Sequence, residues 1–473
     1  MFLAIEVKKG IIIMTYQIDF NHPIEIHFIG IGGISMSGLA EVLLKAGFSI
    51  TGSDWHQSNL TQHLEHLGAI IHYDQKPENI TDSTRAIVFT AAVKPENPEY
   101  QEAVKRNLPI LSRAELLGQI MENYSISIGI SGTHGKTTTT SMLSEIMLTA
   151  QLSPTISVGG ILDCIHGNIH VGHSQYFITE ACEYMNSFLS LYPKIGIILN
   201  ICADHLDFFE DLNDIRRSFQ HYTRNIPEHG TLIINGGIEN LSYFTKGLSC
   251  KVVTFGLLPS CQFYAANITY NDFACGSYDL IINHNKAASI TLSVPGEHNI
   301  LNSLAAVAAA YEMQIPLSQI QSGLSNFQNA NRRFEKKGET HGFTIVDDYA
   351  HHPDEIRATL TAAENYPHHE LWCIFQPHTY TRTKALLKEF AQTLSLADHV
   401  VLADIYSARE TDTLGISSET LLNELKKLGT SCYYFNSFEK IEDFLFTHCE
   451  NGDLLITMGA GDIVKVGESM LKK

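Results

Sequence analysis

The chain has 473 residues, too many for one ordinary hydrophobic core, so the length predicts two to four domains. A composition of 44% apolar and 18% charged residues is typical of a folded globular protein and excludes an intrinsically disordered one. No apolar run approaches the roughly 20 residues that span a bilayer, and a net charge of −19 argues against a general nucleic-acid binder. We therefore expect neither a membrane nor a nucleic acid as a partner.

The nine cysteines are scattered along the chain without a C-x-x-C pair. This pattern indicates reduced thiols in the cytoplasm rather than a disulfide framework or a zinc site. Residues 1–13 (MFLAIEVKKGIII) carry their lysines after the apolar part and lack a small-residue cleavage site, so they do not fit a signal peptide. We expect a disordered extension or a start-site artefact there, because Met14 offers a more natural start.

The first segment, residues 14–123, alternates short apolar runs with helical stretches. Ile24, Ile26 and Phe28 alternate as in a β-strand, and apolar residues of 36–43 follow at helical spacing. Further apolar runs occur at FSITGSD and AIVFTAA. The pattern predicts a βαβ series with a parallel sheet, as in a Rossmann-like domain.

A glycine-rich turn, Gly30, Gly32 and Gly33, lies between that strand and the helix. The N–H groups of such a turn bind a diphosphate, and Asp54 follows about 20 residues later, where an acid that binds ribose falls in dinucleotide-binding proteins. Ser35 stands where the dinucleotide fingerprint has its third glycine. The turn predicts NAD or another nucleotide diphosphate as ligand, and an ordinary tight turn is the alternative.

The second segment, residues 124–328, opens with the alternating stretch YSISIGI and continues into SGTHGKTTTT at 131–140. Loop N–H groups between a strand and a helix cradle phosphate oxygens, and Lys136 would contact the β- and γ-phosphates while the Thr137 hydroxyl contacts Mg²⁺. The standard G-x-x-x-x-G-K-[ST] pattern has a glycine where Ile130 stands. The loop predicts a nucleoside triphosphate, with an ordinary glycine-rich turn as the alternative.

Polar residues follow two further predicted strands of this segment. Glu180 ends the strand in FITEACEY, and Asp204 and His205 follow the strand in NICADHLDFF. Because ligands of open α/β sheets gather at the carboxyl ends of strands, these side chains are candidates for holding Mg²⁺ near Lys136. Mg²⁺ prefers oxygen ligands, so a histidine is unusual here, and a solvated glutamate with a structural histidine is the alternative.

The third segment, residues 329–473, follows the polar stretch NFQNANRRFEKKGE, which is interpreted as a linker, and again shows a βαβ pattern. The stretch VDDYAHHPDEI places Asp347, Asp348 and Tyr349 at one strand end with His351 and His352. The stretch FQPHTYTRT adds a second polar cluster at another strand end. Two such clusters in one domain predict a binding lip, and helix capping with hydration is the alternative for each.

Together these motifs resemble the Mur ligase family. The matching stretches are HFIGIGGISMSGLAE (27–41), GTHGKTTTT (132–140), DHLDFF (204–209), GEHNILNSLAA (296–306), RRFE (332–335), DDYAHHP (347–353) and FQPHTYTRT (375–383). They run through most of the chain, and the combination of GTHGKT with DDYAHHP is highly specific. The family also lacks the early glycine of the standard phosphate loop, which accounts for Ile130.

The resemblance implies a three-domain α/β enzyme. Residues 14–123 would form a Rossmann-like domain that binds a UDP sugar, residues 124–328 a central P-loop-type ATPase domain with a mostly parallel sheet, and residues 329–473 a Rossmann-like α/β domain that binds the amino acid. The implied activity joins L-alanine to the lactyl carboxylate of UDP-N-acetylmuramate in the cytoplasm, for peptidoglycan synthesis, with ATP and Mg²⁺ as cofactors. Monomer and homodimer both remain open.

The resemblance also assigns residues of this chain to each ligand. The UDP sugar would be bound by Gly30, Gly32, Gly33, Ser35, Ser53 and Asp54. ATP would be bound by Gly132, Thr133, His134, Gly135, Lys136, Thr137, Thr138, Asn299, Asn302, Arg333 and Asp348. The metal would be held by Thr137, Glu180 and His205. The amino acid would be bound by Tyr349, His351, His378 and Arg382. Catalytic roles would fall to Lys136, His205, His351 and His378.

Two departures from the family pattern matter. Many members read E-A-D-E-S after the metal-site strand, where this chain has Glu180-Ala-Cys182-Glu183-Tyr184. The first glutamate is kept, so the metal role is expected to survive, while the loop beyond it is expected to contact substrate differently. Several sister ligases use a carbamoylated lysine shortly after the metal histidine, but no lysine lies between Lys194 and Lys246 here, which favours the branch that uses L-alanine.

The implied chemistry explains why these residue types occur together. A carboxylate does not react with an amine at neutral pH, so it must first become an acyl phosphate, whose leaving group is phosphate. The muramate carboxylate would attack the γ-phosphate of ATP, and Lys136 with Mg²⁺ must screen the two anions. The neutral amine of L-alanine would attack next, and a histidine or carboxylate would accept its proton. The turn at Gly30 then holds the UDP diphosphate rather than NAD.

Three other functions stay open on the sequence alone. A nicotinamide-dependent oxidoreductase would explain the Gly30 turn and Asp54, but it leaves the Lys136 loop without a role. A nucleotide-gated binding protein would use the same loop without ligase activity. A related ligase with another acceptor, such as a murein peptide, differs only in the C-terminal pocket.

Overall fold

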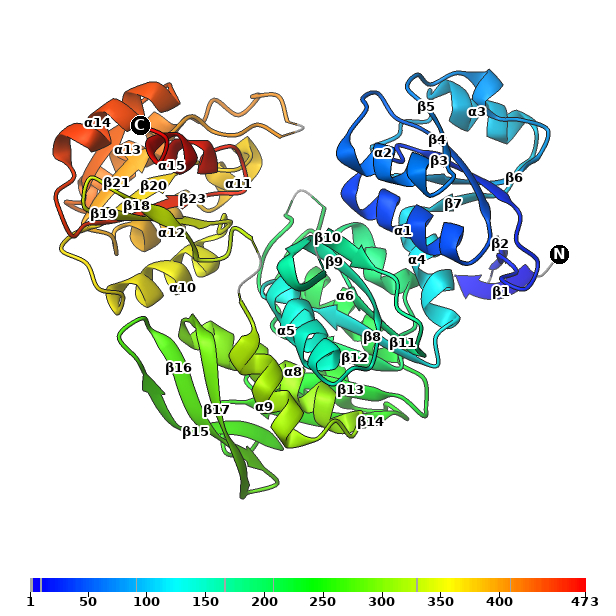
Figure 1. Ribbon diagram of the computed structural model, residues 1–473, viewed down its shortest axis with the longest axis horizontal. Helices are drawn as coiled ribbons and strands as arrows, with labels where there is room; N and C mark the ends of the chain where they lie inside the picture. Colours follow the sequence, from blue (N-terminus) through cyan, green and yellow to red (C-terminus); the bar gives the residue numbers. More distant parts are fainter. Residues whose placement is uncertain are drawn as a thin grey trace.

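The computed structural model describes residues 3–8, 11–90, 92–165, 167–206, 208–328, 331–408 and 410–473. They fold into three α/β domains, each built on its own sheet, and this confirms the predicted fold class. Figure 1 shows the central domain between the other two, which contact it on different sides. Within the described part of the chain, no helix is long and apolar enough to cross a membrane.

The start of the chain forms a small antiparallel pair of strands, β1 (Leu3–Lys8) and β2 (Ile11–Tyr16). The disordered extension expected for residues 1–13 therefore differs from the structure, which describes strands over most of that stretch. The reason is visible in LAIEVK, where apolar residues alternate with Ala, Glu and Lys at the period of a strand.

The first domain has the parallel strand order β5-β4-β3-β6-β7. The strands are β3 (Glu25–Ile29), β4 (Ser49–Ser53), β5 (Ile70–His72), β6 (Thr84–Phe89) and β7 (Ile110–Ser112). The helices are α1 (Ile34–Lys45), α2 (Asn59–His66), the 3₁₀ turn η1 (Pro77–Asn79), α3 (Pro98–Lys105) and α4 (Arg113–Glu122). The chain leaves β3 first toward β4 and later toward β6, so the order reverses beside the glycine-rich turn, where ligands of such sheets bind.

The central domain has the strand order β10-β9-β11-β8-β12-β13-β14-β15-β16-β17, parallel from β9 to β15. The strands are β8 (Ile126–Ser131), β9 (Thr155–Leu162), β10 (Gly167–His170), β11 (Tyr176–Glu180), β12 (Ile195–Ile198), β13 (Thr231–Asn235), β14 (Lys251–Gly256), β15 (Phe263–Tyr270), β16 (Cys275–Ile282) and β17 (Asn285–Pro295). The helical elements are α5 (Lys136–Thr149), η2 (Asp163–Ile165), η3 (Tyr184–Ser190), α6 (Leu212–Arg224), α7 (Ser242–Thr245), α8 (Glu297–Glu312) and α9 (Leu317–Asn326). Because β8 lies between β11 and β12, the loops after these strands meet at one edge of the sheet.

The C-terminal domain has the strand order β18-β19-β23-β20-β21-β22, parallel except for the edge strand β18. The strands are β18 (Glu335–Thr340), β19 (Phe343–Asp348), β20 (Leu371–Phe375), β21 (His399–Leu402), β22 (Ser431–Tyr434) and β23 (Leu454–Met458). The helices are α10 (Pro353–Glu364), α11 (Tyr380–Ala385), α12 (Leu387–Leu394), α13 (Ser418–Lys427), α14 (Phe438–His448) and α15 (Val464–Met470). The predicted linker is thus partly wrong, because its last residues form β18.

Candidate active site

The phosphate-loop motif lies between β8 and α5, as the sequence predicted. Gly135 is the N-cap of α5 and has φ of +84°, a left-handed conformation that favours glycine. A Cβ atom on Gly135 would lie 2.5 Å from Oδ1 of Asn302, so the loop can approach α8 only without a side chain there. The loop N–H groups and the N-terminus of this 14-residue helix form a cradle suited to phosphate.

Lys136 is held by the loop and by a carboxylate that the sequence analysis had not assigned. Its Nζ donates to the carbonyl oxygens of Gly132 and Thr133, at 2.6 and 3.1 Å, and to Oε2 of Glu183 at 3.0 Å. Burial disfavours the ammonium, but the nearby Glu183 carboxylate outweighs it and raises the pKa of Lys136. Lys136 is therefore charged at neutral pH, and Glu183 is a further member of the site.

Hydrogen bonds also fix the loop to the segment after β12. Asn200 accepts the His134 N–H at 2.8 Å through Oδ1 and donates from Nδ2 to the His134 carbonyl at 3.0 Å. The Thr133 hydroxyl accepts the Cys202 N–H at 2.9 Å. Asn200 was missed because an asparagine in a loop carries no motif, and only the pairing of β8 with β12 brings it to the loop.

The three predicted metal ligands lie at neighbouring strand ends. Glu180 ends β11 and accepts the Gly159 N–H at 2.7 Å, and a Cβ on the next residue, Gly160, would lie 3.4 Å from the Thr137 methyl group. Thr137 and Glu180 therefore face consecutive residues of β9. His205 follows β12 with φ of +54°, and its ring packs at a tilt against Tyr184, 4.6 Å between centroids. A carboxylate and a hydroxyl suit Mg²⁺, whereas the imidazole is a less usual ligand.

A cavity of about 290 Å³ lies between the phosphate loop, α8 and the C-terminal domain. Its lining includes seven of the residues predicted to bind ATP, namely His134, Gly135, Thr138, Asn299, Asn302, Arg333 and Asp348. It also includes residues that the sequence analysis did not assign, among them Asn200, Asn235, Phe255, His298, Phe334 and Glu355. The cavity adjoins the phosphate cradle, so loop and cavity together fit a nucleoside triphosphate.

Asp348 organises the C-terminal side of this cavity. Its two carboxylate oxygens accept the N–H groups of Phe334 and Ala350, each at 2.7 Å. Burial raises the pKa of Asp348 to about 6, against the opposing charge of Arg333. The Arg333 guanidinium lies over the Tyr349 ring, 5.4 Å from its centroid, so both side chains belong to the nucleotide side of the site.

A second cavity, of about 480 Å³, lies between the central and C-terminal domains. The central domain contributes Tyr184, Ala203, Asp204, His205 and Leu206, and the C-terminal domain contributes His378, Thr379, Thr381, Arg382, Ala385, Leu386, Ala408 and Glu410. Cys202 lines the nucleotide cavity and Ala203 lines this one, so a single segment after β12 borders both.

Arg382 crosses the domain boundary in this second cavity. Its Nη2 donates to Oδ1 of Asp204 at 3.0 Å, and its Nη1 donates to Nδ1 of His378 at 3.2 Å. Burial opposes the ionised form of Asp204, but the Arg382 guanidinium holds its pKa well below the usual range. Arg382 lines the cavity, and a guanidinium has further N–H donors beyond these two bonds that suit a carboxylate.

The predicted amino-acid residues are only partly brought together. The rings of His351 and His378 lie 5.7 Å apart, and burial lowers the pKa of each to about 4. Both imidazoles are therefore neutral at pH 7. Tyr349 contacts the His351 ring and lies under Arg332 and Arg333, and it is not among the residues that line the second cavity.

Of the predicted UDP-sugar residues, some lie at the start of α1, and Ser53 supports the turn. Gly30 and Ile31 donate their N–H groups to the Ser53 carbonyl, at 2.9 and 3.0 Å, and Asp54 accepts the Gly32 N–H at 2.8 Å. Ser53 is fully buried and its hydroxyl donates to buried Glu99, so its side chain supports the turn and does not face a ligand. Gly33 caps α1, and Ser35 lies in its first turn, where the helix N-terminus offers N–H groups suited to an anion.

Arg113 lies between this turn and Glu180, the carboxylate predicted to hold the metal. It begins α4, is partly buried, and donates from Nη1 to the Ser35 hydroxyl at 3.0 Å. Burial lowers the pKa of Arg113, and the neighbouring Cys182 and Glu180 act in the opposite direction. A partly buried cation between the glycine-rich turn and Glu180 is suited to an anionic ligand. No motif signals it, because a lone arginine at a helix start is common.

Three sequence models of one family match the chain in succession. The Mur ligase family catalytic domain matches residues 25–125, the Mur ligase middle domain matches residues 130–310, and the Mur ligase, glutamate ligase domain matches residues 332–461. These ranges contain the strands of the three large sheets except for most of β8, which begins at Ile126.

Proteins of known name are similar along nearly the whole chain. The UDP-N-acetylmuramate–L-alanine ligase of Lachnospira eligens is 58% identical over 97% of this chain and 100% of that protein, and its namesake in Agathobacter rectalis is 56% identical over the same shares. The crystal structure of the Thermotoga maritima UDP-N-acetylmuramate–alanine ligase has a TM-score of 0.78 at 29% identity, covering 95% of this chain and 98% of that one. A murein peptide ligase from Psychrobacter arcticus has a TM-score of 0.68 at 25% identity, covering the same shares. The resemblance drawn from the sequence is confirmed, and the chain belongs to the Mur ligase family.

Proposed function

We propose that this enzyme joins L-alanine to the lactyl carboxylate of UDP-N-acetylmuramate, with conversion of ATP to ADP and phosphate. The observation that carries the proposal is the segment after β12, which borders the nucleotide cavity through Cys202 and the cross-domain cavity through Ala203. A phosphoryl group and an acceptor bound in the two cavities would meet there. The relatives that bear this activity in their names extend over the whole chain.

The phosphoryl transfer depends on positive charge at the phosphate loop. Lys136 is buried and charged, and its bonds to Glu183 and the loop carbonyls hold Nζ beside the cradle. Mg²⁺ held by Thr137, Glu180 and His205 would neutralise phosphate oxygens when bound. The chain's own part is to bring these groups to one sheet edge, where two anions can approach each other.

The amide-forming step uses the cross-domain cavity. Arg382 is the cation that faces it, and a guanidinium pairs well with the carboxylate of an amino acid. His351 and His378 are neutral at pH 7, so either can accept the proton that leaves the attacking amine. The boundary between the domains keeps this step out of bulk water.

The nucleotide sugar belongs at the first glycine-rich turn. The N-terminus of α1 suits its diphosphate, and Arg113 adds a cation between that turn and Glu180. A sugar bound there would extend its lactyl carboxylate toward the metal site. Since ATP and UDP sugars are cytoplasmic metabolites, we place the reaction in the cytoplasm.

The test is phosphate release by the purified enzyme with ATP, Mg²⁺ and UDP-N-acetylmuramate against a panel of amine acceptors. The panel holds L-alanine, glycine, L-serine, L-leucine, L-glutamate and the tripeptide L-alanyl-γ-D-glutamyl-meso-diaminopimelate. We expect L-alanine to give the highest kcat/KM and glycine and L-serine to be poor substrates, because one methyl group is worth only about 1–3 kcal/mol of discrimination. A preference for the tripeptide would assign the enzyme to murein peptide ligation instead.

A further inference from the structure

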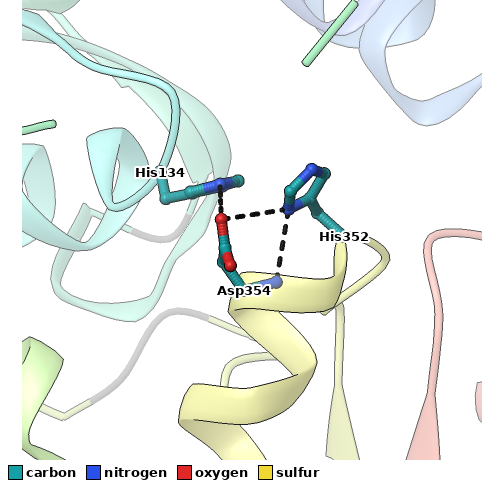
Figure 2. Close-up of side chains that lie close together, drawn as sticks. All are labelled: His134, His352 and Asp354. Carbon is teal, nitrogen blue, oxygen red and sulfur yellow. Dashed lines mark hydrogen bonds and ion pairs between the residues drawn. The ribbon is translucent and has the colours of Figure 1, made fainter. Parts of the chain in front are cut away.

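A cluster of polar side chains joins the central and C-terminal domains outside the residues assigned to Mg²⁺. His134 comes from the loop before α5, His352 is the N-cap of α10, and Asp354 lies in the first turn of that helix (Figure 2). One nitrogen of each histidine and one oxygen of Asp354 all lie within 4.8 Å of one another. The cluster therefore gathers three potential metal ligands from two domains.

The hydrogen bond made by His134 shows which of its nitrogens is engaged as a donor. Nδ1 lies 3.2 Å from Oε1 of Glu355, and a carboxylate oxygen accepts, so Nδ1 is the donor. Nε2 is buried and has no hydrogen-bond partner among the residues that the structure describes. Nε2 lies 3.9 Å from Oδ2 of Asp354. A buried nitrogen without a hydrogen-bond partner costs free energy, so this atom is a candidate to bind a ligand.

The other histidine is fixed in the complementary way. Nε2 of His352 lies 3.2 Å from the carbonyl oxygen of Ala203, which only accepts, so Nε2 carries the proton. Nδ1 is then the nitrogen with the lone pair, and it lies 3.7 Å from Oδ2 of Asp354. It also accepts the Asp354 N–H at 3.3 Å, a long bond that a metal would replace. Both free lone pairs thus belong to nitrogens beside one carboxylate oxygen.

This arrangement has the features of a metal site as well as its ligands. Metal-bound histidines usually donate their second N–H to a carboxylate or a backbone carbonyl. Here the Glu355 carboxylate accepts from His134, and the Ala203 carbonyl accepts from His352. Tetrahedral ligands at zinc distances lie roughly 3.3 Å apart, so separations of 3.7 and 3.9 Å require only small side-chain rotations. The Asp354 side chain is 56% exposed and is free to make them.

We propose that His134, His352 and Asp354 bind a divalent transition metal of the Zn²⁺ type, which bridges the central and C-terminal domains. Two imidazole nitrogens with one carboxylate favour such an ion over Mg²⁺, which prefers oxygen ligands. A water molecule would complete a four-coordinate site. Since the ligands come from both domains, the bound metal holds the domains in the arrangement seen in this structure.

A second histidine–carboxylate cluster provides the matched control. His369, Glu370 and Asp453 also lie within ligand distance of one another, but all three belong to the C-terminal domain. The Asp453 oxygens there already accept N–H groups from Glu370, Trp372 and Glu450. That carboxylate is satisfied by the fold, so a variant of His369 leaves the proposed site intact.

Co²⁺ is the probe, because in a four- or five-coordinate site it gives visible absorption bands that are much stronger than those of the hexahydrated ion. We would titrate Co²⁺ into untagged, metal-free enzyme and into the variants His134→Gln, His352→Gln, Asp354→Asn and His369→Gln. We expect one bound equivalent in wild type and His369→Gln, loss of the bands in both cluster-histidine variants, and at least tenfold weaker binding in Asp354→Asn. Zn²⁺ should displace Co²⁺ and abolish the bands.

Folding is checked by circular dichroism and thermal unfolding, and the exposed Asp354 provides a variant that should fold even if a histidine variant does not. The proposal is overturned if wild type shows no strong visible bands, or if Asp354→Asn binds Co²⁺ as tightly as wild type. It is also overturned if His369→Gln loses the bands, or if either cluster-histidine variant keeps them, because the site would then not bridge the two domains.

Discussion

At the scale of single residues, the Lys136–Glu183 pair links catalysis to stability. The Glu183 side chain is 2% exposed, and Lys136 is its cationic partner. We expect Lys136→Ala to abolish phosphate release and to lower the free energy of unfolding by about 3–5 kcal/mol, because it leaves a buried carboxylate unpaired. Phosphate-release assays and urea denaturation measure the two effects. The double variant with Glu183→Gln should recover stability but not activity, and an unaltered stability of the single variant would contradict the pairing.

Arg382 is the residue expected to set the affinity for the amino acid. We expect Arg382→Lys to raise the KM for L-alanine at least tenfold and the KM for ATP much less, because an ammonium cannot pair with a carboxylate bidentately. Steady-state kinetics with each substrate varied give both constants. Lys384→Gln is the control, since Lys384 lies on the same helix, is exposed and bonds only the Leu414 carbonyl among the described residues. Equal rises in the two constants would assign Arg382 to domain closure alone.

The neutral histidines of the site also predict how stability depends on pH. His351 and His378 have pKa values lowered from 6.5 to about 4 by burial, so each binds a proton more readily in the unfolded chain. Their contribution to stability is present above pH 6.5 and is lost as the pH falls through about 4, a change of a few kcal/mol. Buried Asp348, with its pKa raised to about 6, contributes in the opposite sense. The free energy of unfolding, measured by urea denaturation between pH 7.5 and 4, should therefore fall less steeply with decreasing pH in His351→Gln/His378→Gln than in wild type. An equal pH dependence in the two proteins would refute the assignment.

At the scale of elements, the glycine-rich turn after β3 is shaped by its own neighbours. A Cβ atom on Gly32 would lie 2.8 Å from Oδ2 of Asp54, the atom that accepts the Gly32 N–H. We expect Gly32→Val to push this carboxylate away, distort the start of α1 and weaken binding of UDP-N-acetylmuramate at least tenfold. Calorimetry with the sugar nucleotide measures this, and an unchanged affinity for ADP shows that the central domain is intact. Wild-type affinity for the sugar would mean that the turn serves another purpose.

The elements also show how far the sequence alone reaches. Strands such as β8, β19 and β23 were predicted because each contains a short apolar run, which alternates in β8, and the structure buries these runs. The polar edge strand β18 was taken for a linker, since EKKGET is stabilised by pairing with β19 and not by burial. Likewise, motifs located the phosphate loop, whereas Glu183, Asn200 and Arg113 reach the site only through strand order and domain packing. A sequence reveals a residue type at a fixed spacing, but it does not reveal the partner that a distant segment provides.

At the scale of the whole molecule, the catalytic groups belong to two bodies that must meet. The Asp204–Arg382 pair crosses from the central to the C-terminal domain, and both side chains are largely buried, at 8% and 13% exposure. His352 adds a second link through the Ala203 carbonyl. The arrangement in Figure 1 leaves the first domain outside this junction, so these two links bear on the contact between the central and C-terminal domains. Since Arg382 also lines the cavity between these domains, we expect binding of the acceptor and contact between the domains to depend on each other.

Removing the pair should open the molecule. Breaking a buried ion pair costs about 3–5 kcal/mol, and each 1.4 kcal/mol is a factor of ten in an equilibrium, so Asp204→Asn should depopulate the closed arrangement. We expect a larger radius of gyration in small-angle X-ray scattering than for wild type, and a raised KM for L-alanine. Lys251→Gln is the matched control, because it removes an exposed ion pair with Glu312 within the central domain. If Asp204→Asn and Lys251→Gln scattered alike, the Asp204–Arg382 pair would orient the guanidinium without holding the domains together, and closure would depend on other contacts.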